Sequence, residues 1–67
     1  MENMELVITA LDEYRDSVNF TYKPDEWDSF DYGGLYLMVY KNNQCIGMYN
    51  QSRVMWVRTT PYEGDDN

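Results

Sequence analysis

Histidine is absent from this sequence, and cysteine occurs only once, at Cys45. Most general acid–base catalysis uses histidine, and nucleophilic catalysis needs a nucleophile placed beside a base, so the sequence indicates neither chemistry. A single cysteine cannot form an intramolecular disulfide, and nothing else points to an oxidising compartment. We therefore expect a cytoplasmic protein that is not an enzyme and has no cofactor, no catalytic residues and no metal site.

Basic residues and long apolar runs are also scarce. Five Lys and Arg residues oppose twelve Asp and Glu residues, which gives a net charge of −7. Proteins bind nucleic acid largely by neutralising phosphates with Lys and Arg, and anionic membrane surfaces attract the same residues. The apolar runs are far shorter than the roughly 20 residues that span a bilayer. We expect no direct nucleic-acid binding and no membrane contact.

The composition is that of a small globular protein. The chain has 67 residues, of which 43% are hydrophobic and 16% aromatic. This length suits a single domain, over residues 1–67, with a small core. Seven tyrosines and two tryptophans are more than so small a core can enclose, so we expect some rings to lie half-exposed.

Residues 1–18 have the apolar spacing of an amphipathic helix. The apolar residues that share one helical face are Met4, Val7, Ile8, Leu11, Tyr14 and Val18. The acids on the opposite face are Glu2, Glu5, Asp12, Glu13 and Asp16. An alternative interpretation makes residues 5–8 a strand, with Thr9 and Asp12 as the capping box of a shorter helix. The period over the whole segment favours one helix.

The rest of the chain divides into a connection, a sheet and a tail. Residues 19–34 form an acidic, aromatic connection, in which Pro24 begins a helical turn and Gly33-Gly34 ends the segment. Residues 35–60 predict a three-stranded antiparallel β-meander, with turns at residues 41–44 and 50–52. Residues 61–67 are an acidic tail. The predicted fold class is α+β, one N-terminal helix packed on a three-stranded antiparallel sheet in the order α-β-β-β.

The negative charge is concentrated at the beginning of the chain. Residues 1–34 contain nine of the twelve acids, whereas residues 35–60 contain none. The helix and the connection could form one continuous anionic surface, with Trp27 and Tyr32 as exposed aromatic anchors among carboxylates. The predicted partner-binding residues are Asp12, Glu13, Asp16, Asp25, Glu26, Trp27, Asp28, Asp31 and Tyr32.

In size, charge and aromatic content, the whole chain resembles the small acidic inhibitors that phages encode, which include DNA mimics, uracil-DNA glycosylase inhibitors and anti-CRISPR proteins. The resemblance implies that carboxylates stand in for phosphates in the basic groove of a nuclease, CRISPR effector or DNA repair enzyme. It would place the protein in the host cytoplasm.

Two other interpretations remain open. The acidic face can be a solvated surface that keeps the protein soluble. Alternatively, an interaction module or a homodimer can use an edge strand or an open sheet face. Leu35, Leu37 and Val39 would lie on one face of the sheet and Tyr36, Met38 and Tyr40 on the other, and the sequence leaves open which face is covered.

Overall fold

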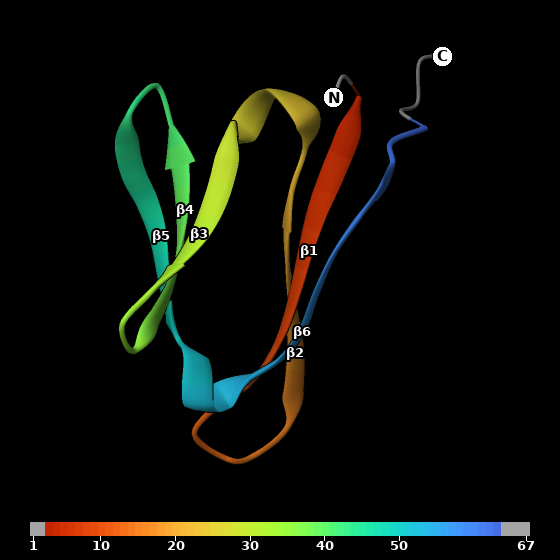
Figure 1. The fold of residues 1–67 in the computed structure, drawn as a ribbon. Helices are drawn as coiled ribbons and strands as arrows, with labels where there is room; N and C mark the ends of the chain where they lie inside the picture. The colour runs from red at the N-terminus through yellow and green to blue at the C-terminus, as the bar shows by residue number, and fades with distance from the viewer. Residues whose placement is uncertain (1–2, 64–67) are drawn as a thin grey trace.

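The computed structural model describes residues 3–63, which form two packed β-sheets (Figure 1). The strands are β1 (Met4–Leu11), β2 (Ser17–Tyr22), β3 (Ser29–Gly33), β4 (Tyr36–Lys41), β5 (Gln44–Asn50) and β6 (Val54–Pro61). Two short 3-10 turns, η1 (Pro24–Glu26) and η2 (Gln51–Arg53), connect one sheet to the other. Both sheets are antiparallel, with strand orders β2-β1-β6 and β3-β4-β5.

The predicted α+β fold is wrong, because residues 3–63 contain no α-helix and residues 4–11 are a strand. The helical spacing arose because β1 is the central strand of its sheet and is buried on both faces over residues 6–10. A strand buried on both faces is apolar at consecutive positions and loses the simple alternation of a half-exposed strand. The alternative of a strand at residues 5–8 was closer, although no helix follows it.

The segment expected as a connection, residues 19–34, contains most of β2 and all of β3. Two of its local predictions are confirmed. Pro24 begins the turn η1, and Gly34 has a positive φ of 61° at the β3–β4 turn.

The predicted β-meander is correct only in its first half. β4 and β5 form the expected hairpin, in which Asn42 and Asn43 both have positive φ. The second turn, however, is η2, and it carries the chain to the other sheet, where β6 pairs with β1. This pairing places Val57 opposite Ile8 and allows Val54 and Val57 to pack against the core. Of the predicted acidic tail, Pro61 ends β6 and residues 64–67 lie outside the described residues.

The core lies between the two central strands. Leu6 and Ile8 of β1 and Leu37 and Val39 of β4 are completely buried. Trp27, which follows η1, completes this cluster, and its indole Nε1 donates a hydrogen bond to the Met4 carbonyl oxygen at 3.1 Å. The chain crosses from the first sheet to the second at η1, near one end of the sandwich. It crosses back at η2, near the opposite end (Figure 1).

The edge strands β2 and β5 face each other across the sandwich. The rings of Phe20 and Tyr49 lie 5.1 Å apart between centroids, and the hydroxyls of Tyr22 and Tyr49 are hydrogen-bonded at 2.5 Å. Burial raises the pKa of Tyr49 above its ordinary value, and the hydrogen bond with the Tyr22 hydroxyl raises it further.

Candidate partner-binding surfaces

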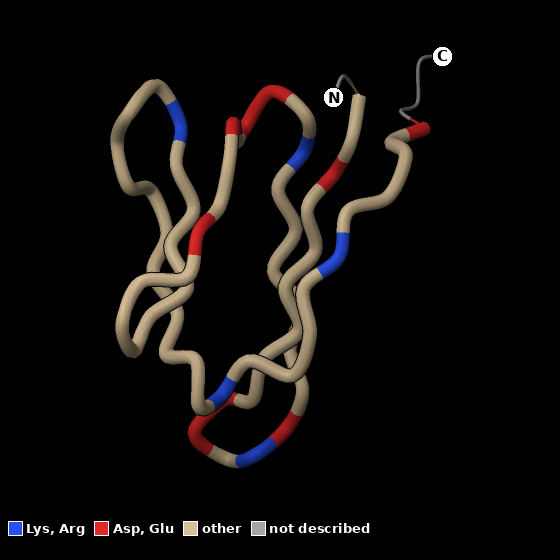
Figure 2. Tube along the Cα trace, in the orientation of Figure 1, with Lys and Arg blue, Asp and Glu red and all other residues tan. Residues whose placement is uncertain are grey.

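The acids predicted for a helix lie in the loop between β1 and β2, here called the acidic hairpin loop (residues 12–16; Figure 2). The Asp12 backbone N–H donates to the Asp16 carbonyl, and the Arg15 N–H donates to the Asp12 carbonyl. The Asp12 carboxylate accepts hydrogen bonds from the N–H groups of Tyr14 and Asp16 at 2.8 and 2.9 Å. Asp12 therefore holds the loop, whereas Glu13 and Asp16 are exposed.

A second acidic group, Asp25, Glu26 and Asp28, lies in and just after η1 (Figure 2). The Glu26 carboxylate accepts a hydrogen bond from the Lys23 N–H at 2.8 Å and so stabilises the start of the turn. Asp28 accepts a hydrogen bond from the Asn42 N–H at 2.7 Å and forms an ion pair with Lys41 at 3.8 Å. Asp25 is exposed and has no hydrogen bond or ion pair from its side chain within residues 3–63.

The two acidic groups do not join into one helical surface. They lie at opposite ends of β2, whose six residues extend for about 20 Å at ~3.4 Å per residue. Figure 2 shows them at opposite ends of the molecule. The predicted continuous surface along a helix is therefore wrong, and two separate acidic turns replace it.

Asp31 and Tyr32 lie in β3 and occupy alternate faces of the second sheet. Asp31 pairs with Met38, whereas Tyr32 pairs with Leu37, whose side chain is in the core. The Asp31 carboxylate accepts a hydrogen bond from the Tyr32 N–H at 2.9 Å, and the Tyr32 side chain remains 53% exposed. These neighbours therefore do not present a carboxylate and a ring to the same surface.

Trp27 does not have the expected exposure. Only 8% of it is accessible, because its ring packs in the core beside Phe30. The exposed ring among acids is instead Tyr14, which is 76% accessible in the acidic hairpin loop. Its position between Glu13 and Asp16 was a usable signal, but the helical period assigned Tyr14 to the core face.

A third surface lies on the outer side of the second sheet. Leu37 and Val39 point into the core, so Tyr36, Met38 and Tyr40 alternate to the outside. The sequence predicted that these two sets face opposite sides of the sheet, but not which side is open. Met48 of β5 pairs with Met38 and is 57% exposed. We call Tyr36, Met38, Tyr40 and Met48 the aromatic–methionine face. Asp31 of β3, which pairs with Met38, borders this face.

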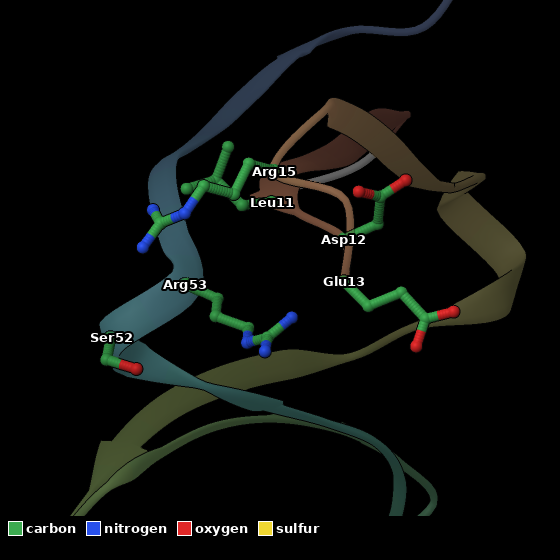
Figure 3. A pocket seen from close by; sticks show the side chains of 6 residues that line it. All are labelled: Leu11, Asp12, Glu13, Arg15, Ser52 and Arg53. Carbon is green, nitrogen blue, oxygen red and sulfur yellow. The ribbon is translucent and has the colours of Figure 1, made fainter.

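The acidic hairpin loop and η2 enclose a hollow of about 440 Å³ (Figure 3). Its lining residues are Leu11, Asp12, Glu13, Arg15, Ser52 and Arg53. These residues come from elements that are far apart in the sequence, and Figure 3 shows the charged ends of Arg15 and Arg53 pointing in different directions and the carboxylates of Asp12 and Glu13 pointing away from both.

No metal-binding cluster accompanies these surfaces within residues 3–63. This part of the chain has no group of three Cys, Asp or Glu side chains placed to hold a metal ion. It also has no helix long and apolar enough to cross a membrane. Comparison with protein-family models gives no match, and neither curated proteins nor solved structures give a match to the chain.

Proposed function

We propose that this protein is a non-catalytic inhibitor that binds the basic groove of a nucleic-acid-processing protein. The partner is a nuclease, a CRISPR effector or a DNA repair enzyme, and the carboxylates of this chain occupy positions that phosphates would take. The observation that carries the proposal is the exposure of acidic side chains in two turns at opposite ends of β2, namely Glu13 and Asp16 at one end and Asp25 at the other.

The exposed acids are free to meet a partner. Asp12, Glu26 and Asp28 each use carboxylate oxygens to hold a turn, and so contribute mainly to the local structure. Glu13 and Asp16 accept no side-chain hydrogen bond or ion pair within residues 3–63. Tyr14 lies between them in the sequence, is exposed and supplies a ring that can stack on an arginine.

The spacing of the two turns suits a groove that follows a nucleic-acid strand. The six residues of β2 separate them by about 20 Å, and phosphates on one DNA strand repeat every ~3.4 Å along the axis. The two acidic turns thus lie about six phosphate steps apart. Complementary charge at both ends of a groove would accelerate association and fix the orientation of the complex.

The first test reverses the exposed charges. A partner is captured from host lysate at low salt and identified by mass spectrometry, and its affinity is then measured with purified proteins. We expect the Glu13→Lys/Asp16→Lys double variant and the Asp25→Lys variant each to weaken binding at least tenfold, because like charges would then face the groove. Circular dichroism should show an unchanged fold.

A matched control is available on β5. The Gln44→Lys/Cys45→Lys double variant changes the net charge by the same amount as Asp25→Lys, at exposed positions that belong to neither acidic turn. It should bind nearly as well as the native protein. If the control loses as much affinity for the partner as the charge-reversal variants do, the effect depends on net charge alone. If all variants bind as the native protein does, the acidic turns do not form the contact.

The second test is competition. If carboxylates replace phosphates, short duplex DNA or guide RNA and this protein cannot occupy the target together, and added nucleic acid should displace the protein by mass action. A ternary complex without mutual weakening would contradict mimicry and indicate allosteric inhibition.

A second candidate function is an interaction module that uses the aromatic–methionine face. Its support is the exposure of Tyr36 and Met48 on the outside of the second sheet, since Tyr and Met are common in interface cores. Contacts through this face should respond little to salt, whereas exposed charges are screened beyond ~8 Å at physiological ionic strength. The Met48→Lys variant should then abolish binding while the charge reversals leave it intact.

A further inference from the structure

β6 is an edge strand of the first sheet, and no strand within residues 3–63 pairs with its side away from β1 (Figure 1). It has eight residues, whereas the other three edge strands, β2, β3 and β5, have five to seven. The unpaired N–H and C=O groups of an open edge can bind a further strand. β6 is therefore the longest open edge that the described part of the chain offers.

The hydrogen bonds at the end of β6 show which of its backbone groups face the open side. The Tyr62 N–H donates to the Asn3 carbonyl oxygen at 2.8 Å, so these two residues continue the antiparallel ladder as a hydrogen-bonded pair. Hydrogen-bonded and non-hydrogen-bonded pairs alternate along such a ladder, and Pro61, opposite Met4, therefore lies at a non-hydrogen-bonded position. Its ring nitrogen, which has no hydrogen to donate, accordingly faces away from β1.

The same alternation applies to the middle of the strand, because the register with β1 is regular over residues 56–61. Arg58 and Thr60 direct their N–H and C=O groups to β1, whereas Val57 and Thr59 direct theirs to the open side. None of the turn and loop backbone hydrogen bonds within residues 3–63 uses the groups of Val57 or Thr59. These two residues thus present donors and acceptors to a partner strand.

The side chains along this edge suit a second copy of the same chain. Val57 packs against the core, so Trp56 and Arg58 lie on the outer face of the first sheet, where both are exposed. β6 contains no acid, although the whole chain has a net charge of −7. Two copies that meet along β6 therefore bring no carboxylates of this strand together.

We propose that β6 pairs antiparallel with β6 of a second copy, about a two-fold axis at Val57. Open-side groups bond only to open-side groups, which requires the axis to pass through a residue of the strand. An axis at Arg58 would place the two guanidinium groups opposite each other, and an axis at Trp56 would place each guanidinium group opposite Val54. Residues 54–60, which lie between η2 and the final proline of β6, are centred on Val57. The dimer does not depend on the proposed inhibitor function.

At this register, Trp56 of each copy lies opposite Arg58 of the other. The two residues form a non-hydrogen-bonded pair, in which the Cα atoms are about 4.5 Å apart and the side chains are close. A guanidinium group over an indole ring makes a favourable cation–π contact, and the two-fold axis repeats it. Met55, which has no partner in β1, and Pro61 interrupt the edge on either side, so the pairing closes as a dimer.

The first test measures self-association and the open edge together. Sedimentation equilibrium over the micromolar to millimolar range should show a monomer–dimer equilibrium, because one strand per copy makes a small interface. Amide hydrogen exchange, followed by NMR over the same range, should slow at Val57 and Thr59 as the dimer forms, whereas Arg58 and Thr60 should be protected at every concentration. Added sodium chloride should strengthen the dimer by screening the repulsion between two chains of −7, while it weakens binding to a basic groove.

Two pairs of variants separate the interface from the fold. Arg58→Gln should weaken dimerisation roughly five- to thirtyfold, since each dimer contains the contact between Trp56 and Arg58 twice. Lys23→Gln makes the same charge change at an exposed position after β2, the opposite edge strand of the sheet, and should leave dimerisation nearly unchanged. Thr59→Pro removes an open-side N–H and should abolish the dimer while the fold remains, whereas Thr60→Pro removes a bond to β1 and should lower the melting temperature.

Three results would overturn the dimer or its register. A protein that stays monomeric at millimolar concentration has no such dimer. If the Val57 and Thr59 amides become protected only after the captured target is added, the edge binds that target and not a second copy. Equal weakening by Arg58→Gln and Lys23→Gln would exclude the proposed cation–π contact and, with it, the axis at Val57. Arg58→Gln leaves the backbone groups in place, so this comparison stands even if Thr59→Pro does not fold.

Discussion

Gly47 of the edge strand β5 lies against the side chain of Tyr22 of β2. A Cβ atom at this position would collide with the hydroxyl of Tyr22, which is fixed by its hydrogen bond to Tyr49. We predict that Gly47→Ala lowers the free energy of unfolding by about 1–3 kcal/mol, the usual cost of overpacking. Urea denaturation measures this change.

Gly33→Ala is the matched control for Gly47→Ala. A Cβ atom at Gly33 would meet only the terminal methyl of Met38, the end of a flexible side chain on the outer face. That methyl can move, so Gly33→Ala should be clearly less destabilising. Equal losses in the two variants would mean that the contact between β2 and β5 does not limit the packing.

Tyr49 should make the stability sensitive to alkaline pH. Burial and Tyr22 raise the pKa of Tyr49 in the folded state above the unfolded value of about 10. The folded state therefore retains this proton more strongly, and the stabilisation is complete below pH ~10 and declines as the pH rises further. Urea denaturation between pH 8 and 11 should show a shallower decline for Tyr49→Phe than for the native protein.

The control for this pH effect is Tyr14→Phe, because Tyr14 is 76% exposed at the tip of the hairpin loop. Its profile should follow that of the native protein. If Tyr49→Phe also follows the native profile, the hydroxyl pair between the sheets does not contribute to the alkaline loss.

At the scale of elements, the β4–β5 hairpin depends on two asparagines with positive φ. Asn42 and Asn43 have φ values of 54° and 64°, the pattern of a type I′ turn, for which Asn-Gly is the preferred pair. Asn43→Gly should raise the free energy of unfolding by about 0.5–1 kcal/mol, and Asn43→Ala should lower it by about 1 kcal/mol. Thermal unfolding of both variants tests the sign, and stabilisation by Ala would contradict the turn assignment.

The hairpin was predictable because its signal is local. Two asparagines between alternating apolar residues fix the turn and the pairing of Lys41 with Gln44, whereas a bulge between Val39 and Tyr40 then shifts the register, so that Leu37 lies opposite Tyr49. β1 gave no such local signal. Its apolar residues fit a helix as well as a strand. What makes it a strand is pairing with other parts of the chain, since Ile8 lies opposite Phe20 of β2 on one side and Val57 of β6 on the other.

At the scale of the molecule, stability should depend on the few residues that both sheets share. Leu37 of β4 is completely buried against the core of the first sheet. Leu37→Ala should cost about 2–5 kcal/mol, a large part of the stability available to so small a domain. Leu35→Ala, at a position 71% exposed, should cost almost nothing, as circular dichroism during urea titration would show. Similar losses at both positions would place the core elsewhere.

The sequence by itself determined the size and the charge of this protein, together with the features that depend on neighbouring residues. The turn at Pro24, the left-handed Gly34 and the hairpin at Asn42 and Asn43 all follow from local backbone preferences. So does the placement of Tyr36 on the face opposite Leu37, because side chains alternate along a strand.

Only the tertiary structure decided which strands pair and which side chains the two sheets enclose. Trp27 looked like an exposed anchor among acids, but the crossing at η1 carries it into the core, where the Met4 carbonyl satisfies its N–H. Tyr14 was expected on the core face of a helix, but it lies exposed at the tip of the loop between β1 and β2. Arg15 and Arg53, which are 38 positions apart in the sequence, line the same hollow because η2 returns the chain to the end of β1. Pairing between distant strands depends on the burial of the whole apolar surface, which no short window of sequence contains.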